Sequence, residues 1–265
     1  YCMDMSVAIV NYKTAELTKK LLRSLADENL KMEIVVLDNG SQDGIGETLK
    51  KEFSHITFIQ NEVNTGFSKG YNKAIAATNG DHILILNSDI EVRKGSLKKL
   101  LEAAKYYSSK AVVVGRLVLP DGSIQKSAFH LPAIAGALKE YFLNQCNSYF
   151  SYLPSQNEPS VIEGAVMACF LIPRIIWERI GKLDEGTELY FEDIEYCRRL
   201  KEANIPIYYI PDAIFDHHHG ASSKKLPEGE ALKKLQKAAK RYHGSFSYYL
   251  ITFVLWLGQK VRRIG

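Results

Sequence analysis

LILNSDIEV, residues 84–92, joins a buried-strand pattern to an abrupt polar ending. Its apolar run is typical of a strand inside a sheet, and it stops at Asn87, Ser88 and Asp89. An amide, a hydroxyl and a carboxylate therefore lie where a strand should end. The pattern predicts either a turn that only closes the strand or a polar site at the edge of a sheet.

Strand-like and helix-like segments alternate on both sides of this stretch. Short apolar runs predict strands at residues 7–10, 34–37, 57–59, 83–86 and 111–114. Helical periodicity, with Thr14 as the first N-cap, predicts helices at residues 16–25, 47–53, 71–78 and 96–107. This alternation predicts an α/β fold in which right-handed crossovers build a mainly parallel sheet flanked by helices.

Polar residues follow the predicted strands at the edge where ligands bind in such sheets. Asn11 and Tyr12 follow the first strand, and Asp38 follows the second. Asp38 could accept hydrogen bonds from a base or a ribose, or its turn could merely cap backbone groups. Residues 64–72, NTGFSKGYN, bring two glycines to a helix start, which suits a nucleotide or phosphate as well as a plain turn.

Three carboxylates open a further predicted helix at residues 192–203. The helix dipole stabilises acidic residues there, and Glu195 can pair with Arg199 one turn later. The preceding aromatic segment, residues 189–191, could instead desolvate Asp193 and raise its pKa toward that of a working base. The residues alone leave both interpretations open.

His217, His218 and His219 are consecutive, so their side chains cannot all face one point. One or two of them could contact a metal or a phosphate. The alternative is an exposed polar loop.

Composition sets the outer limits of these interpretations. A chain of 265 residues with 46% apolar residues can bury a real core, which predicts one catalytic domain with a tail. The net charge of +4 says little about nucleic acid. Four scattered cysteines without a C-x-x-C pair argue against a disulfide framework or a zinc knuckle. No signal peptide is evident in the opening residues, so we expect a cytoplasmic protein.

The middle of the chain is less regular. Residues 119–123, LPDGS, predict a hairpin tip. From residue 126 to 160 the periodicity is lost, which predicts an insertion or an acceptor lid over the site. A strand at residues 166–172 follows, and Pro173 suits the first turn of a helix that extends through Ile180.

Taken in order, these motifs resemble the GT-A glycosyltransferases of family 2, especially their rhamnosyltransferase-like branch. The matching segments are VAIVNY (7–12), VVLDNGSQDG (35–44), NTGFSKGYN (64–72), LNSD (86–89), EGAVMACFLIPR (163–174), LDEGTELYFEDIEYCRRL (183–200) and HHHGAS (217–222). The resemblance implies a GT-A, Rossmann-like domain over residues 1–223. It also implies an inverting hexosyltransferase that moves rhamnose or a similar sugar from a dTDP-, UDP- or GDP-linked donor.

The resemblance also assigns roles to single residues. Asp89 would be the main ligand of Mg²⁺ or Mn²⁺, because Asn87 stands where the family's D-x-D motif has its first Asp. His217 would contact the metal or the diphosphate. Asp193, with Glu192 beside it, would be the catalytic base. Donor-binding residues would be Asn11, Tyr12, Asp38, Asn64, Gly66, Asn72, Asn87 and Ser88.

Residues 224–265 predict a basic tail that contacts a membrane. Residues 230–242 are amphipathic, and residues 246–257 are nearly all apolar or aromatic, a run shorter than the about 20 residues that a membrane span needs. Flanked by cations, this run fits an in-plane helix on an anionic surface. The alternative is a helix docked on the catalytic domain or on a partner in a homodimer. Membrane contact suggests a lipid-linked glycan acceptor and a peripheral location on the cytoplasmic face of the cell membrane.

Other classes of protein share parts of the pattern. A nucleotidyltransferase would need a glycine-rich, basic loop after Val10, which the sequence lacks. A catalytically inactive nucleotide-sugar sensor or scaffold is a second alternative, against which Asp89 and the Glu192-Asp193 pair speak. No G-x-G-x-x-G follows the first strand, which argues against a dinucleotide oxidoreductase. The apolar run of the tail suits lipid better than nucleic acid.

Overall fold

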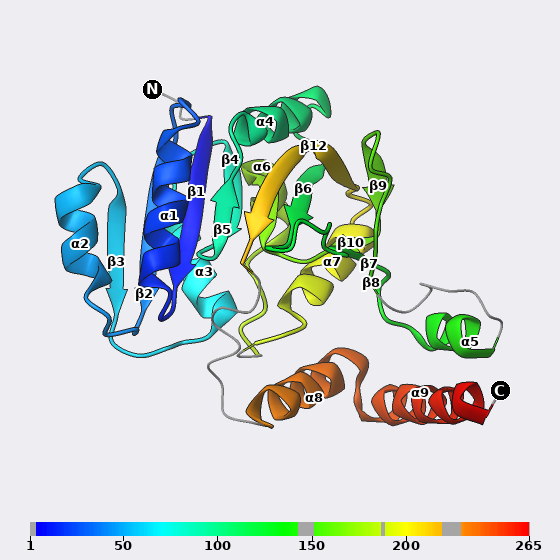
Figure 1. Cartoon of the computed structure of the whole chain (residues 1–265). Helices are drawn as coiled ribbons and strands as arrows, with labels where there is room; N and C mark the ends of the chain where they lie inside the picture. Colours follow the sequence, from blue (N-terminus) through cyan, green and yellow to red (C-terminus); the bar gives the residue numbers. More distant parts are fainter. Residues whose placement is uncertain (1–3, 143–150, 187–188, 219–228, 265) are drawn as a thin grey trace.

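The computed structural model describes residues 4–142, 151–186, 189–218 and 229–264. Within these residues a nine-stranded sheet organises the chain, in the order β3-β2-β1-β4-β11-β6-β12-β5, with β9 paired to β12 (Figure 1). In that order the strands are β3 (Thr57–Asn61), β2 (Glu33–Asn39), β1 (Met5–Asn11), β4 (His82–Asn87), β11 (Cys169–Pro173), β6 (Val112–Val118), β12 (Ile207–His217), β5 (Ile90–Val92) and β9 (Ser160–Ile162).

Parallel pairing joins the four strands of the predicted alternation. β1 pairs in parallel with β2 and β4, and β2 pairs in parallel with β3. The intervening helices, α1 (Ala15–Ala26), α2 (Ile45–Glu52) and α3 (Phe67–Ala76), bring the carboxyl ends of these strands to one edge. β11, β5 and β9 run antiparallel to their neighbours. The predicted α/β fold is confirmed, with a mixed second half of the sheet.

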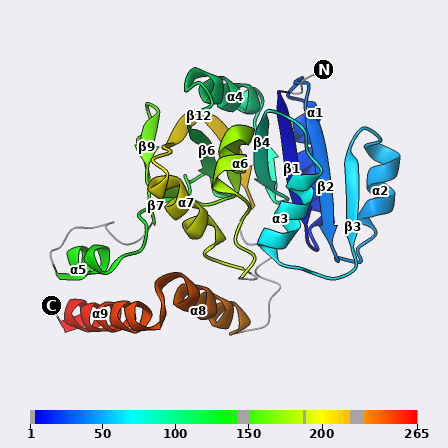
Figure 2. The same ribbon diagram turned by 180° about the vertical axis from the view of Figure 1, so that it is seen from behind.

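Helices cover both faces of the sheet because successive strand residues point to opposite sides. Besides α1 to α3, the covering helices are α4 (Ser96–Tyr106), α6 (Arg174–Ile180) and α7 (Glu192–Glu202). Val7 and Ile9 of β1 belong to the core with α1, α2 and α4, whereas Ala8 belongs to the core with α3, α6 and α7. Figure 2 shows the face that α3, α6 and α7 cover.

Two helix starts differ from the sequence predictions. α3 begins at Phe67 rather than at residue 71, because Gly66 adopts a φ of 87° and forms the break directly before it. Pro173 is the last residue of β11 and the N-cap of α6, since its ψ of 135° keeps it extended. The hairpin tip after β6 is confirmed: the backbone N–H of Leu119 donates to the carbonyl of Ser123 at 2.8 Å.

The insertion at residues 126–160 contains a small sheet and a helix. β7 (Ala128–Phe129) pairs with β8 (Ser151–Tyr152) and with β10 (Gly164–Ala165), and α5 (Ile134–Phe142) follows β7. Nδ1 of His130 lies 3.0 Å from the Glu163 carboxylate, which also binds Lys201 of α7. These contacts tie the insertion to α7. Its role as an acceptor lid stays a prediction, and residues 143–150 lie outside the described residues.

The tail forms α8 (Glu230–His243) and α9 (Ser245–Ile264), on the side of the molecule toward which β2 and β3 point (Figures 1 and 2). α9 extends beyond the predicted apolar run at both ends. One side of α9 lies against α5, where a Cβ on Gly258 would be 2.5 Å from the side chain of Tyr141. This contact agrees with the alternative in which the tail helix docks on the catalytic domain. Among the described helices, none combines the length and the apolar character that a membrane crossing requires.

Candidate active site

Asn11, at the carboxyl end of β1, shares a buried polar network with Asp38 at the end of β2. Nδ2 of Asn11 donates to Oδ1 of Asp38 at 2.7 Å and to Oγ of Ser41 at 3.0 Å. Oδ2 of Asp38 accepts from the backbone N–H of Ser41 and from Nε2 of Gln60. Asn11 and Asp38 are almost fully buried, whereas Tyr12 beside them is partly exposed. The network fixes the strand-end loops, and direct contact of these residues with base and ribose stays a prediction.

Asn39 organises the glycine-rich loop, although the sequence reasoning did not select it. Its Nδ2 donates to Oδ1 of Asn64 at 3.0 Å and to the carbonyl of Gly66 at 3.1 Å. Gly40 allows the two loops to approach, because a Cβ there would lie 2.6 Å from the backbone of Val63. Asn64 and Gly66 are thereby held at the edge where the donor is predicted to bind.

Thr14 connects the end of β1 to the Asn-Ser-Asp turn. Its Oγ1 donates to Oδ1 of Asn11 at 2.9 Å and lies 2.7 Å from Oγ of Ser88. Thr14 therefore precedes α1 as predicted, but its hydroxyl spans two strand ends and makes no side-chain cap to the helix. Asn87 accepts a hydrogen bond of 3.2 Å from the hydroxyl of Tyr71 on α3. A continuous set of contacts thus runs from Asp38 to the turn.

Asp89 and His217 meet because β5 pairs with β12, with His217 opposite Ile90. Nε2 of His217 lies 3.3 Å from Oδ1 of Asp89, and both residues are buried. On the other side of the ring, Nδ1 lies 2.7 Å from Oε1 of Gln125. Gln125 therefore orients the imidazole so that Nε2 faces Asp89. Gln125 is a further site residue that sequence reasoning missed.

The structure distinguishes His217 from His218. His217 is 5% exposed at the end of β12, so the interpretation as an exposed loop is wrong for this residue. His218 turns away, with Nε2 3.6 Å from Oε2 of Glu91, as the alternation of strand side chains requires. His219 lies outside the described residues. Of these two described histidines, His217 is the one that can share a ligand with Asp89.

The Asp89–His217 pair fits a divalent cation. An imidazole nitrogen and a carboxylate oxygen that face each other at 3.3 Å can hold a cation between them. Among the described residues, no group of three or more His, Cys, Asp or Glu side chains gathers as a metal site. Mg²⁺ and similar cations commonly use one or two protein ligands and complete their shell with substrate phosphates and water. The pair suits such a shared site.

Asn72 binds the segment that leads into α7. Its Oδ1 accepts from the backbone N–H of Leu183 at 3.0 Å, and its Nδ2 donates to the carbonyl of Leu183 and to Oε1 of Glu185. Because the neighbouring Tyr71 contacts Asn87, α3 links the Asn-Ser-Asp turn to the start of α7. Donor binding by Asn72 itself stays a prediction.

The backbone is strained directly before Glu192 and Asp193. Tyr190 and Phe191 adopt φ values of 72° and 69°, a left-handed conformation that costs a non-glycine residue about 1–2 kcal/mol. The Phe191 ring packs against Tyr242 of α8, with ring centroids 5.3 Å apart. Such conformations persist where packing enforces them, and they concentrate at active sites.

Burial raises the pKa of both carboxyl groups at the start of α7. Desolvation is the main cause for Glu192, with repulsion from Asp193 added, and desolvation is also the main cause for Asp193. Oε2 of Glu192 is buried without a hydrogen-bond partner among the described residues. Glu195, in contrast, forms the predicted ion pair with Arg199 at 2.8 Å. Asp193 therefore has the environment of a general base, and Glu195 that of a structural ion pair.

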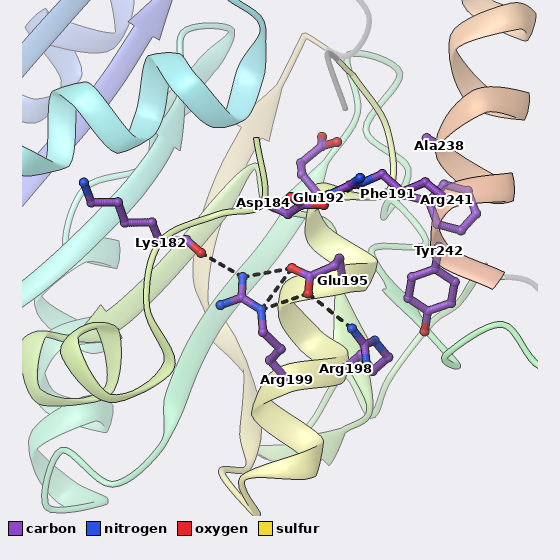
Figure 3. A pocket seen from close by; sticks show the side chains of 10 residues that line it. All are labelled: Lys182, Asp184, Phe191, Glu192, Glu195, Arg198, Arg199, Ala238, Arg241 and Tyr242. Atoms are coloured by element: carbon purple, nitrogen blue, oxygen red, sulfur yellow. Dashed lines mark hydrogen bonds and ion pairs between the residues drawn. The ribbon is translucent and has the colours of Figure 1, made fainter. Parts of the chain in front are cut away.

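A cavity of about 420 Å³ lies beside Glu192, between the start of α7 and α8 (Figure 3). From the catalytic domain it is lined by residues that include Asp184 and Glu192, and from α8 by Ala238, Arg241 and Tyr242. Nε and Nη2 of Arg241 bind the two oxygens of Asp184 at 2.9 and 3.0 Å. The tail thus contributes one wall of a cavity that is lined by Glu192, whereas the adjacent Asp193 is not among the lining residues.

The fold and the polar strand edge define a GT-A glycosyltransferase domain. GalNAc-T7 with UDP, GalNAc and Mn²⁺ shares the fold with a TM-score of 0.68 at 14% identity, over 91% of this chain and 48% of that chain. The mannosyltransferase PcManGT from Pyrobaculum calidifontis, in complex with GDP-Man and Mn²⁺, gives a TM-score of 0.59 at 14% identity, over 96% of this chain and 65% of that chain. The chain belongs to glycosyl transferase family 2, whose model matches residues 6–176.

Similar curated proteins include a hexosyltransferase and two rhamnosyltransferases. The low-salt glycan biosynthesis hexosyltransferase Agl10 of Haloferax volcanii is 28% identical over 77% of this chain, and the match spans 64% of Agl10. The N-acetylglucosaminyl-diphospho-decaprenol L-rhamnosyltransferase of Mycobacterium tuberculosis is 26% identical over 84% of this chain and 78% of that protein. The rhamnosyltransferase WbbL of Escherichia coli is 26% identical over 80% of this chain and 83% of WbbL. These similarities agree with the rhamnosyltransferase-like branch that the motifs resemble.

Proposed function

We propose that this chain is an inverting glycosyltransferase that moves rhamnose or a similar sugar from a nucleotide-diphosphate sugar to a hydroxyl of a lipid-linked glycan. The observation that carries the proposal is the close approach of Asp89 and His217, 3.3 Å apart at the strand edge of a family 2 domain. The named rhamnosyltransferase relatives support the choice of sugar. The M. tuberculosis relative, whose name specifies a diphospho-decaprenol substrate, supports the class of acceptor.

One displacement accounts for the chemistry. The acceptor hydroxyl oxygen bonds to the anomeric carbon on the face opposite the diphosphate, the bond to the diphosphate oxygen breaks, and Asp193 takes the hydroxyl proton. The anomeric configuration inverts as a result. Asp89 and His217 would hold Mg²⁺ or Mn²⁺, which when bound neutralises the charge that develops on the leaving diphosphate.

The donor would occupy the polar edge formed by β1, β2 and β4. Asn11, Tyr12 and Asp38 are proposed to hold the base and ribose. The residues proposed to border the sugar and diphosphate are Asn64, Gly66, Asn72, Asn87 and Ser88. The support for a preformed donor site is the hydrogen bonds that members of this set form with one another and with the neighbouring Thr14, Asn39 and Tyr71.

A screen of dTDP-, UDP- and GDP-sugars with Mg²⁺ or Mn²⁺ tests the function. We expect metal-dependent release of a nucleoside diphosphate from at least one donor. Donor binding without release would instead support a nucleotide-sugar sensor, and nucleotidyl transfer with release of pyrophosphate would support a nucleotidyltransferase. Either result would contradict the proposal.

We also propose that the outer stripe of α9 contacts the membrane surface at the cytoplasmic face. The outer stripe consists of apolar side chains that are 37–82% exposed and recur at helical spacing: Phe246, Tyr249, Leu250, Phe253, Trp256 and Leu257. Nζ of Lys260 lies 4.2 Å from the Trp256 ring centroid, so a cation accompanies the stripe. Aromatic side chains with neighbouring cations suit an anionic interface.

The double substitution Phe253→Ser and Trp256→Ser is expected to weaken membrane binding. Each exposed aromatic side chain contributes about 1.5–3 kcal/mol when it is buried in lipid, so loss of both should lower partitioning by about 100-fold or more. Flotation with vesicles that contain an anionic lipid measures this effect. Leu232→Ser, at a 57% exposed position on α8, is the matched control. Equal flotation of the double variant and the wild type would count against the membrane contact and favour a second copy of the chain on this stripe.

The transfer rate is expected to fall as the pH is lowered. Because desolvation raises the pKa of Asp193, its carboxylate becomes protonated at a higher pH than an exposed aspartate of pKa about 3.9. A plot of log kcat against pH should therefore rise through the raised pKa and then level off, with donor binding measured in parallel. A flat profile down to about pH 4 would contradict the assignment of Asp193 as base.

A further inference from the structure

The cavity beside Glu192 has a size and a position that the donor site does not explain. Its volume of about 420 Å³ is within the range of about 300–1,000 Å³ that is typical of small-ligand sites. One wall is the start of α7, which carries Asp193. The opposite wall is α8, a helix from the part of the chain beyond the family match at residues 6–176.

We propose that this cavity binds the terminal glycosyl unit of the acceptor, and that α8 sets acceptor specificity through Tyr242 and Arg241. The inference rests on the proposed function, because a sugar bound here matters only if Asp193 activates one of its hydroxyls. It goes beyond the sequence prediction, in which residues 224–265 contact a membrane or dock on protein and have no part in substrate binding.

The lining has the chemistry that a sugar ring requires. Phe191 and Tyr242, with ring centroids 5.3 Å apart, offer aromatic surface to the apolar C–H face of a ring. Glu192 and Arg198 contribute charged side chains to the lining. A carboxylate that accepts and a guanidinium that donates match the hydroxyls of a sugar.

Two residues of α8, Arg241 and Tyr242, hold this helix as the outer wall. Arg241 binds Asp184 through two nitrogens, at 2.9 and 3.0 Å. Tyr242 packs on Phe191, and the guanidinium carbon of Arg198 lies 5.7 Å from the centroid of the Tyr242 ring. Figure 3 shows Arg241 and Tyr242 of α8 on the side of the cavity opposite Lys182. Because α9 follows α8 directly, the same tail carries the outer stripe and one wall of the cavity. This arrangement suits an acceptor whose glycan extends from a lipid.

The test uses the full chain, a donor that the screen identifies, and a panel of octyl glycosides as acceptor probes. Tyr242→Ala is expected to raise the KM for the preferred octyl glycoside by about tenfold, because a stacking ring is lost, while the KM for the donor stays that of the wild type. Tyr242→Phe, which keeps the ring, should retain most of the affinity. Lys237→Ala removes an exposed cation from α8 and is the control that leaves both KM values unchanged.

Ala238→Leu provides a second test of acceptor binding if Tyr242→Ala fails to fold. Ala238 is 1% exposed and lines the cavity, so a larger side chain should narrow it and raise the acceptor KM. An unchanged acceptor KM in the folded variants, or a failure of every octyl glycoside to bind the wild type, overturns the inference. These outcomes are distinct from failure of the proposed function, which would show as no metal-dependent turnover of any donor.

Discussion

Replacement of Asp193 by Asn is expected to lower kcat for sugar transfer by about 10²–10⁴-fold, the usual contribution of a general base. The amide keeps the shape of the side chain and can still accept the 2.8 Å hydrogen bond from the backbone N–H of Ile194, but it cannot take a proton from the acceptor. Donor binding should survive. Single-turnover transfer rates and donor titration on the same preparation measure the two effects.

Glu202→Gln is the matched control, because Glu202 is an exposed carboxylate on the same helix, where it pairs with Arg198.

The pH dependence of protein stability gives a second test of the environment of Asp193. A carboxyl whose pKa is higher in the folded protein than in the unfolded chain makes stability fall as the pH rises through that interval. Asp193→Asn removes this loss, so the variant should be at least as stable as the wild type at pH 8. Near-normal turnover in a folded variant would remove the assignment of Asp193 as base.

The second large effect is expected for Asp89→Asn, with a loss of transfer of about 10²-fold or more at limiting Mn²⁺. The carboxylate supplies the negative charge of the proposed cation site, and His217 alone offers one ring nitrogen. The loss should shrink as Mn²⁺ is raised, because weaker binding is partly overcome by mass action. Initial rates over a range of Mn²⁺ concentrations, together with calorimetric titration of Mn²⁺ in the presence of a nucleoside diphosphate, test both points.

Asp121→Asn provides the comparison for this experiment. Asp121 is an exposed carboxylate in the hairpin after β6, where it accepts hydrogen bonds from Ser123. Its replacement should leave the dependence on Mn²⁺ unchanged. If Asp89→Asn shows the same half-maximal Mn²⁺ concentration as Asp121→Asn and the wild type, Asp89 does not bind the cation.

The parts of the fold that the sequence predicted are those that repeat locally. Alternation of short apolar runs with helical periodicity identified β1 to β4 and the helices between them, because each pattern depends on neighbouring residues. The polar groups at Asn11, Asp38 and Asp89 were recognised since they interrupt those patterns at strand ends. The ion pair of Glu195 with Arg199 was equally accessible, because one helical turn sets its spacing.

Contacts between distant segments could not be predicted in this way. Gln125 orients His217 from the strand-like segment after the hairpin, and nothing near Gln125 in the sequence marks it as part of a site. The sequence patterns indicated Asp38 rather than Asn39 as a site residue, because Asp38 carries a charge. The approach of Tyr242 to Phe191 depends on how α8 packs on α7, which periodicity does not encode. In each case the contact joins residues that only the tertiary structure brings together.

The pairing of β5 with β12 has a consequence for biosynthesis. Asp89 is translated before His217, which is the last residue of β12. This strand must insert between β6 and β5 before the two side chains can meet. A nascent polypeptide that has not yet added β12 carries half of the proposed cation site and cannot assemble it from nearby segments. The ability to use a donor would then appear only after β12 has been added to the sheet. An incomplete polypeptide on the ribosome would therefore consume no activated sugar.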